Sequence, residues 1–172
     1  WFIEPYGKPV SDDWIRLMVD QLTYDKDIVL GYSYYHKAKT FYNRMARFDN
    51  QYLSMQYLSM AIKGKPYTGV YRNVAFRKHL FFEHKGFASY LNVENGEDVF
   101  INQIVNETNT SVSLQADSFV ETTLRNFVLW RQIKKSFSVA QANFKKSVNW
   151  RFSFEAFSRY IFYALVLIAI AY

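Results

Sequence analysis

The sequence predicts an α/β domain followed by an apolar C-terminal helix, and three observations support this prediction. Strand-like and helix-like segments alternate from the first residues onward, which is typical of α/β folds. Half of the 172 residues are hydrophobic and only 6 Gly and 3 Pro interrupt the chain, so it can fold around a sizeable core. The last segment, residues 160–172, carries no charged side chain. The chain has no cysteine, which excludes disulfides, thiolate catalysis and zinc–thiolate sites.

The first 35 residues predict the order strand, helix, strand. Residues 1–6 are expected to be the end of a buried strand that leads into a loop, and Gly7-Lys8-Pro9 has the composition of a loop. Ser11 is a favourable N-cap for a helix over residues 12–22. The apolar run Ile28-Val29-Leu30 then predicts a central strand, because strands buried on both faces are continuously apolar.

A long amphipathic helix is predicted over residues 39–62. Its apolar side chains recur at steps of three and four residues, so they share one face of a helix. We expect this face to pack in the core of the domain. The residues of the face are Phe41, Met45, Phe48, Tyr52, Met55, Leu58 and Ile62.

The second half of the chain predicts short strands and helices in turn. An irregular strand-like segment carries Arg72 and Asn73, which on their own would be residues that solvate a loop. An apolar series after Gly96 predicts a buried helix that begins there. The other predicted segments are a strand at 70–77, a helical turn at 78–83, strands at 111–114 and 119–123, and a basic amphipathic helix at 125–137.

Two adjacent carboxylates, Glu97 and Asp98, fall in the first turn of the helix that begins at Gly96. One interpretation is structural, because the helix dipole and free backbone N–H groups favour carboxylates there. The other is catalytic, with one carboxylate held at a cleft as a general base and its neighbour orienting it. The helix terminus is expected to lower the pKa of the base, which would then be ionised near neutrality.

Charge is distributed unevenly along the chain, whose formal net charge is +6. Residues 125–159 contain eight Lys or Arg side chains and the single acid Glu155. A basic segment with interleaved aromatic residues can bind nucleic acid. Here the segment runs directly into the most apolar stretch, which favours a membrane surface as the partner and not nucleic acid. We therefore expect residues 125–149 to be a basic interfacial segment and residues 150–172 to start a transmembrane helix, with a buried core helix as the alternative.

Motifs near the N-terminus are similar to those of a known family. Glu4-Pro5-Tyr6 stands where that family has an Asp-x-Asp segment, with Glu4 at the first Asp and Tyr6 at the second. The next segment, Pro9-Val10-Ser11-Asp12-Asp13-Trp14, matches the pattern Pro-x-Ser-x-x-Trp that follows it in the family.

Three later motifs continue the same order. The segment from Gly69 to Arg77 resembles a glycine-containing acceptor-side segment that ends in Asn and a basic residue, and Gly96-Glu97-Asp98 resembles a Gly-(Asp/Glu)-Asp motif. Gln132-Ile133-Lys134-Lys135-Ser136 keeps the Gln and a cation of a Gln-x-x-Arg-Trp-like motif. Together these motifs resemble the membrane-associated family 2 glycosyltransferases, which have a GT-A fold.

The resemblance implies a fold, a reaction and a location. Residues 1–124 would be the later part of a GT-A (Rossmann-like) domain that lacks its N-terminal nucleotide-binding half. The reaction would transfer a sugar, with inversion, from a nucleotide-sugar donor to a hydroxyl of a glycan or lipid-linked acceptor at the cytosolic face of a membrane. Without a complete donor site, the chain alone is expected to be inactive.

The resemblance also implies roles for single residues. Asp98 would be the general base, with Glu97 as its neighbour, and Glu4 would bind a divalent cation, Mg²⁺ or Mn²⁺, because hard cations take oxygen ligands. The donor diphosphate would lie near Glu4, Gln132, Lys135 and Arg131, and the acceptor near Gly69, Arg72, Asn73 and Trp130.

Two other classes of function stay open at this point. The first is a non-catalytic, membrane-anchored relative that binds a sugar nucleotide or a protein partner, suggested by the loss of the second Asp at Tyr6 and of the Arg-Trp pair. The second is a basic nucleic-acid binder, whose affinity would depend steeply on salt concentration.

Overall fold

The computed structural model describes residues 2–171, with the side chains of residues 3–148, 154 and 157–170. Trp1 and Tyr172, the outer ends of two predicted segments, lie outside the described residues. In chain order the elements are β1 (Phe2–Ile3), β2 (Gly7–Pro9), α1 (Trp14–Val19), β3 (Ile28–Gly31), β4 (Ser33–Tyr35), α2 (Phe41–Ile62), β5 (Asn73–Phe76), α3 (Lys78–Glu83), η1 (Ala88–Tyr90), α4 (Gly96–Ile104), β6 (Thr110–Ser113), η2 (Ala116–Ser118), β7 (Val120–Thr122), α5 (Phe127–Ala142) and α6 (Lys146–Ala171).

The strands form two small mixed sheets, which confirms the predicted α/β class at the level of a mixed α/β fold. One sheet has the order β1-β5-β3-β6, with β3 antiparallel to β5 and parallel to β6. The other has the order β2-β7-β4, with β4 parallel to β7. Only Tyr32 separates β3 from β4, so one stretch of chain passes from the first sheet into the second.

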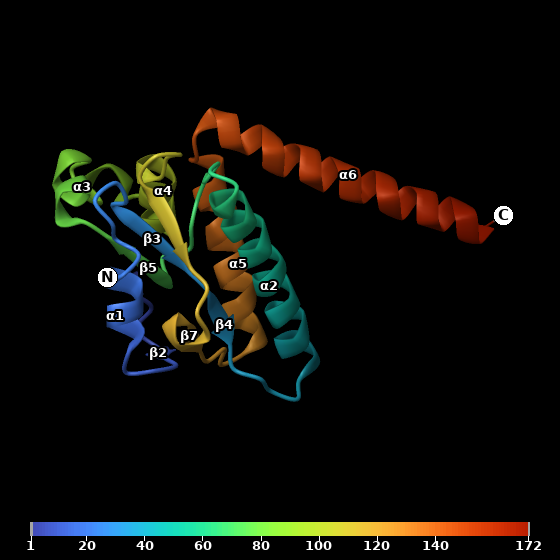
Figure 1. Cartoon of the computed structure of the whole chain (residues 1–172). Helices are drawn as coiled ribbons and strands as arrows, with labels where there is room; N and C mark the ends of the chain where they lie inside the picture. The colour runs from blue at the N-terminus through green and yellow to red at the C-terminus, as the bar shows by residue number, and fades with distance from the viewer. Residues whose placement is uncertain (1, 172) are drawn as a thin grey trace.

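The core lies on both faces of β3, the predicted central strand. Ile28 and Leu30 pack against α2 and α4, whereas Val29 packs on the other face with Trp14 and Met18 of α1. This alternation follows from the two-residue period of a strand. Figure 1 shows the same layering, with α1 on one side of the strands and α2 and α5 on the other.

A row of polar side chains on α2 faces the strands. Asn43, Asn50 and Tyr57 recur every seven residues, are buried, and donate hydrogen bonds of 2.7–3.0 Å to three backbone carbonyls within residues 31–36. The accepting carbonyls belong to Gly31, Ser33 and His36, which are two and three residues apart and span roughly 7 and 10 Å of extended chain, against about 10.5 Å for seven helical residues. The row therefore matches the stretch where the chain crosses between the sheets, and it satisfies carbonyls that would be costly to bury unpaired.

The opposite face of α2 is apolar and exposed. Of the seven residues expected in the core, only Leu58 is buried. Phe41, Phe48, Met55 and Ile62 expose 78%, 65%, 62% and 60% of their surface. The predicted helix is confirmed, but the predicted inward face is wrong, because the hydrogen bonds of the polar row turn that row toward the strands.

One amide joins four distant segments on the α1 side of the fold. The Asn73 side chain accepts a 3.0 Å hydrogen bond from the Trp14 indole and donates 2.9 Å bonds to the carbonyls of Tyr32 and Ser118. A Cβ on Gly31 would lie 2.4 Å from this amide, so the close approach requires glycine. The sequence context suggested that Asn73 solvates a loop. It is instead a buried structural residue.

The N-terminal segment differs from the prediction in two places. Residues 7–9, expected to form a loop, are strand β2 and pair with β7. Ser11 does not cap a helix; its hydroxyl accepts the N–H of Asp13, and α1 begins only at Trp14. The pairing with β7 holds residues 7–9 extended, and that partner lies more than 100 residues away in the chain.

The C-terminal third consists of two helices. α5 extends five residues beyond the predicted helix at 125–137, and α6 begins at Lys146, ahead of the predicted start at residue 150. In Figure 1, α6 projects away from the rest of the protein, and every described side chain from residue 157 to 170 is exposed. Within residues 2–171, no helix combines the length and the apolar character needed to cross a membrane.

Candidate functional site

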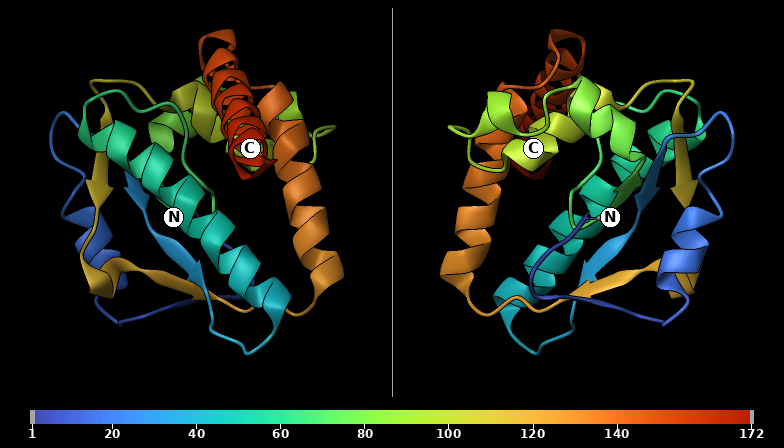
Figure 2. Two further views of the ribbon diagram at one scale, coloured as in Figure 1. Left: turned by 90° about the vertical axis from the view of Figure 1, so that its right-hand side faces the viewer. Right: turned by 90° about the vertical axis from the view of Figure 1, so that its left-hand side faces the viewer.

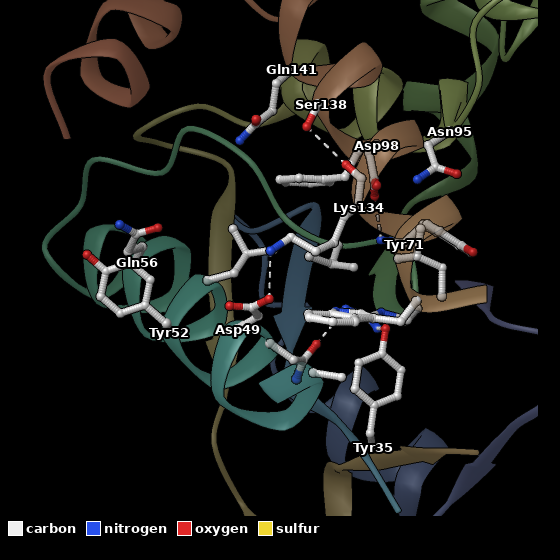
Figure 3. A pocket seen from close by; sticks show the side chains of 18 of the residues that line it. Tyr35, Asp49, Tyr52, Gln56, Tyr71, Asn95, Asp98, Lys134, Ser138 and Gln141 are labelled. Carbon is white, nitrogen blue, oxygen red and sulfur yellow. Dashed lines mark hydrogen bonds and ion pairs between the residues drawn. The ribbon is translucent and has the colours of Figure 1, made fainter. Parts of the chain in front are cut away.

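A cavity of about 340 Å³ lies between α2 and α5, and its floor is formed by residues 70–72 and by the start of α4. Figure 3 shows the side chains of both helices converging on it. Its walls are mostly aromatic and polar. Its lining residues include Glu4, Tyr35, Asp49, Asn50, Tyr71, Arg72, Asp98, Trp130, Ile133, Lys134 and Phe137.

Asp98 is the buried carboxylate of the cavity. It lies in the first turn of α4, as predicted, and is 1% exposed. Its Oδ1 accepts a 2.9 Å hydrogen bond from the backbone N–H of Tyr71, so the carboxylate joins α4 to the 70–72 segment. It does not cap its own helix: the N-cap residue is Asn95, in the left-handed region at φ 55°. Asp98 is therefore not the N-cap of α4, and its side chain lines the cavity.

Burial raises the pKa of Asp98 to about 7, although the Tyr71 hydrogen bond and the charge of Arg72 lower it. The nearby Glu97 and Glu4 carboxylates raise it further. The expectation that the helix terminus would lower this pKa is therefore wrong, because removal of water outweighs the helix terminus. A carboxyl group with a pKa near the working pH can both accept and return a proton.

Arg72 is a fixed cation in the floor of the cavity. It is buried, donates a 2.6 Å hydrogen bond to the Tyr35 hydroxyl, and also donates to Oδ1 of Asn50. Burial favours a lower pKa for Arg72, but neighbouring Tyr35, Glu4 and Asp98 outweigh it and the pKa is raised. Arg72 thus does not solvate a loop; it is a charged group held inside a cavity by two polar partners.

Glu4 is the second carboxylate of the cavity. Its Oε1 accepts a 3.4 Å hydrogen bond from the Tyr71 hydroxyl, while Oε2 is buried without a hydrogen-bond partner. An unsatisfied carboxylate oxygen could face a cation, but among the described side chains no group of three or more His, Asp or Glu is placed to hold a metal ion. Within the described part of the chain, Glu4 therefore has too few partners to form a metal centre. We assign no chemical step to a metal.

The wall formed by α5 differs from the predicted one. Trp130, Ile133, Lys134 and Phe137 line the cavity, whereas the predicted diphosphate ligands, Gln132, Lys135 and Arg131, are exposed elsewhere on the helix. Residues three and four apart share a helix face, so Lys134 lies with Trp130 while its neighbours do not. Of the predicted residues on this helix, the structure brings only Trp130 to the cavity.

Lys134 is the cation that α5 contributes. Its Nζ lies 2.8 Å from Oδ2 of Asp49 on α2 and 5.1 Å from the centre of the Trp130 ring. This ion pair bridges the two helices across the cavity (Figure 3). Both side chains are partly exposed, so the pair contributes little to stability. A charged ligand could compete with Asp49 for Lys134.

Three other predicted site residues lie off the cavity. Gly69 is packed between Leu30 and Ile101, and a Cβ on it would lie 2.5 Å from Leu30 Cδ2. Asn73 faces the α1 side, as described above. Glu97 is half-buried beside Asp98 and does not line the cavity.

Sequence reasoning missed several lining residues, and some of them had a detectable signal. Lys134 is four residues after Trp130, so the helical period places it on the same face as this predicted site residue. Asn50 belongs to the seven-residue polar row of α2. Tyr71 and Asp49 carry no such signal, because their roles depend on which segments pack together.

Comparisons with known proteins yield no match: no protein-family model, curated protein or solved structure is significantly similar to this chain.

The cavity therefore combines groups suited to acid–base chemistry on a polar ligand. Asp98 can exchange a proton near neutral pH, Arg72 and Lys134 supply positive charge, and Trp130 supplies an apolar surface. A concave site with a few convergent polar groups and a perturbed pKa is a typical ligand-binding site.

Proposed function

We propose that this chain is part of a glycosyltransferase that transfers a sugar from a nucleotide-sugar donor to an acceptor hydroxyl. One observation carries the proposal: a buried carboxyl group, Asp98, with a pKa of about 7 in the floor of a 340 Å³ cavity. The finer assignments, a partial GT-A domain within residues 1–124 and inversion at the sugar, belong to the same proposal and rest on the motif resemblance.

The reaction assigns one step to Asp98. Its carboxylate takes the proton of the acceptor hydroxyl as that oxygen attacks the anomeric carbon of the donor. The bond from this carbon to the diphosphate oxygen breaks, and the nucleoside diphosphate leaves with the bonding electrons. General-base assistance of this kind contributes about 10²–10⁴ in rate.

The cations and the aromatic wall have binding roles in this proposal. Arg72 is held by Tyr35 and Asn50, so it can meet phosphate oxygens without losing further side-chain entropy. Lys134 would leave its ion pair with Asp49 and pair with a phosphate of the ligand. The Trp130 ring would lie against a sugar. These roles replace the predicted ones of Gln132, Lys135 and Arg131.

The proposal also locates the protein at the cytosolic face of a membrane. Its support is the basic segment of α5 together with the exposed apolar side chains of α6. A helix that is apolar all round is normally covered by protein or lipid. A glycan or a lipid-linked molecule would supply the acceptor hydroxyl.

The test compares Asp98→Asn with Asp117→Asn, which changes an exposed carboxylate in η2. With the full-length protein that contains this chain in membranes and a panel of UDP- and GDP-sugars, we expect Asp98→Asn to lower transfer about a hundredfold or more and Asp117→Asn to leave it unchanged. The rate of the parent protein should rise with pH and level off above about 7, because only ionised Asp98 acts as a base. Equal rates for Asp98→Asn and the parent would refute the assignment.

A non-catalytic binding protein is the second candidate, and one observation favours it. Tyr71 already engages both carboxylates of the cavity: its hydroxyl donates to Glu4 and its backbone N–H donates to Asp98. This candidate predicts that the parent protein binds a nucleotide sugar, measured by calorimetry, without transferring or hydrolysing it. Turnover by the parent protein that Asp98→Asn abolishes would exclude it.

A further inference from the structure

The outer face of α2 is an apolar surface that the fold leaves uncovered. Phe41, Phe48, Met55 and Ile62 recur every seven residues along about 30 Å of helix, and each exposes 60% or more of its surface. A continuous exposed apolar row of this length usually marks a binding surface. We propose that this row, with the cations of α2 and α5 beside it, binds the surface of an anionic lipid bilayer.

The distribution of charge selects the bilayer as the occupant. Residues 36–65 and 125–159, which contain α2, α5 and the start of α6, hold fourteen of the 21 Lys and Arg but only two of the 15 Asp and Glu. The rest of the chain is acidic. Arg44 and Arg47 lie exposed on α2 beside the apolar row, and Arg131 and Lys135 lie exposed on α5. Apolar side chains beside cations are the pattern that binds anionic headgroups.

The same distribution disfavours a second copy of the chain. Two copies meeting through this face would bring their cationic helices together, with Asp49 on each copy already paired to Lys134. Like charges at an interface are repulsive, whereas anionic lipid would neutralise them.

The position of α6 is consistent with this orientation. Figure 2 shows α6 leaving the protein beside α2 and α5 and pointing away from the strands. The Arg159 guanidinium lies 5.7 Å from the centre of the Tyr52 ring on α2, and this ring stacks on Phe48 of the apolar row, so α6 meets α2 next to the row. Beyond Arg159, residues 160–170 are uncharged and exposed. The apolar row and this helix can therefore enter one bilayer from the same side.

The chain offers a direct test because it contains no cysteine. A single NBD fluorophore is attached at Met55→Cys in one variant of the full chain and at Phe82→Cys, an exposed site on α3, in the matched control. On adding vesicles of phosphatidylcholine and phosphatidylglycerol, we expect the emission at position 55 to shift to the blue and to rise, and that at position 82 to stay unchanged. Vesicles of phosphatidylcholine alone should give a weaker response.

Two results would overturn the proposal. If the protein sediments with the vesicles while the emission at position 55 stays the same as without vesicles, then α6 binds the lipid and α2 does not. If position 55 shifts without vesicles as the protein concentration rises, a second copy covers the row. Circular dichroism of both labelled variants checks that they are folded. Neither result depends on sugar transfer, so the reaction proposed above is tested separately.

A second measurement avoids the label. The pair Phe48→Gln and Met55→Gln should weaken the vesicle partition coefficient by roughly tenfold for each side chain, because each loses about half of the transfer free energy of a buried apolar side chain. Phe82→Gln, the control, should leave it unchanged. An unchanged coefficient for the double variant would also refute the proposal.

Discussion

Two faces of one helix contrast most sharply in this protein. On α2, Asn43, Asn50 and Tyr57 form a polar row that is buried, and Phe41, Phe48, Met55 and Ile62 form an apolar row that is exposed. Both rows repeat every seven residues and lie on opposite sides of the helix. The side chains of the inner row donate hydrogen bonds to backbone carbonyls in the stretch where the chain crosses between the two sheets. Apolar periodicity therefore identifies a helix but does not by itself identify the side that faces the core.

The largest effect is expected when the contrast between buried polar groups and exposed side chains is extended to charge, by comparing buried Asp98 on α4 with exposed Asp117 in η2. The pKa of Asp98 is about 7 in the folded protein against 3.8 for the ordinary group, so between these values the folded state binds a proton that the unfolded state has lost. The free energy of unfolding should then fall by about 1.4 kcal/mol for each pH unit from about 4 to 7 because of this group. Asp98→Asn should remove that slope, and Asp117→Asn should keep it, in urea unfolding measured across this range.

The next largest effect is expected from the centre of the inner row. Asn50→Ala removes the partner of the Ser33 carbonyl and one partner of the Arg72 guanidinium, both buried. We expect a loss of roughly 2–4 kcal/mol in the free energy of unfolding, since one of the orphaned groups is charged. Gln51→Ala, one residue away and exposed, should change it by less than about 0.5 kcal/mol. Equal losses of unfolding free energy in the two variants would show that the hydrogen bonds of the inner row do not stabilise the fold.

Tyr57→Phe should have a smaller effect. The ring stays packed in the core, whereas the hydroxyl loses its 2.9 Å hydrogen bond to the Gly31 carbonyl and its hydrogen bond with the Ser54 side chain. The expected destabilisation is about 1–2 kcal/mol, the cost of leaving one buried neutral group unpaired. Thermal unfolding of Tyr57→Phe beside Tyr24→Phe, which changes a fully exposed tyrosine, measures it. A null result for Tyr57→Phe would mean that water replaces the lost bond.

The outer row should show the smallest effect on stability. Phe48→Gln, without lipid, should change the free energy of unfolding by less than about 0.5 kcal/mol, because the side chain is already in water. Leu58→Ala, in the buried member of the predicted stripe, should cost about 2–4 kcal/mol. If Phe48→Gln costs as much as Leu58→Ala, the contrast between the two faces does not hold.

Local patterns predicted most of the secondary structure. The apolar run of β3, the long helix α2 and the start of α4 at Gly96 all lie where their residues indicate. β2 was missed because its strand conformation depends on pairing with β7, more than 100 residues away. The face of α2 was assigned wrongly because the decisive partners are backbone carbonyls, which carry no sequence signature.

The candidate site was predictable only in part. Asp98, Arg72, Glu4 and Trp130 all line the cavity, although their chain segments are far apart. Lys135 was chosen over Lys134 by alignment to a motif, whereas the helical period favours Lys134. The raised pKa of Asp98 could not be predicted, because it depends on burial that only the packed structure reveals.

The Asn73 junction has a consequence for the order of folding. Its three hydrogen bonds join residues separated by 59, 41 and 45 positions in the chain, so they require the closure of long loops. Contacts of such high sequence separation are slow to form and are often absent from the folding transition state. Substitution of Asn73 should therefore speed unfolding and leave the folding rate almost unchanged. The hydrogen bonds of Asn73 thus form after the folding transition state, and they lengthen the lifetime of the native state.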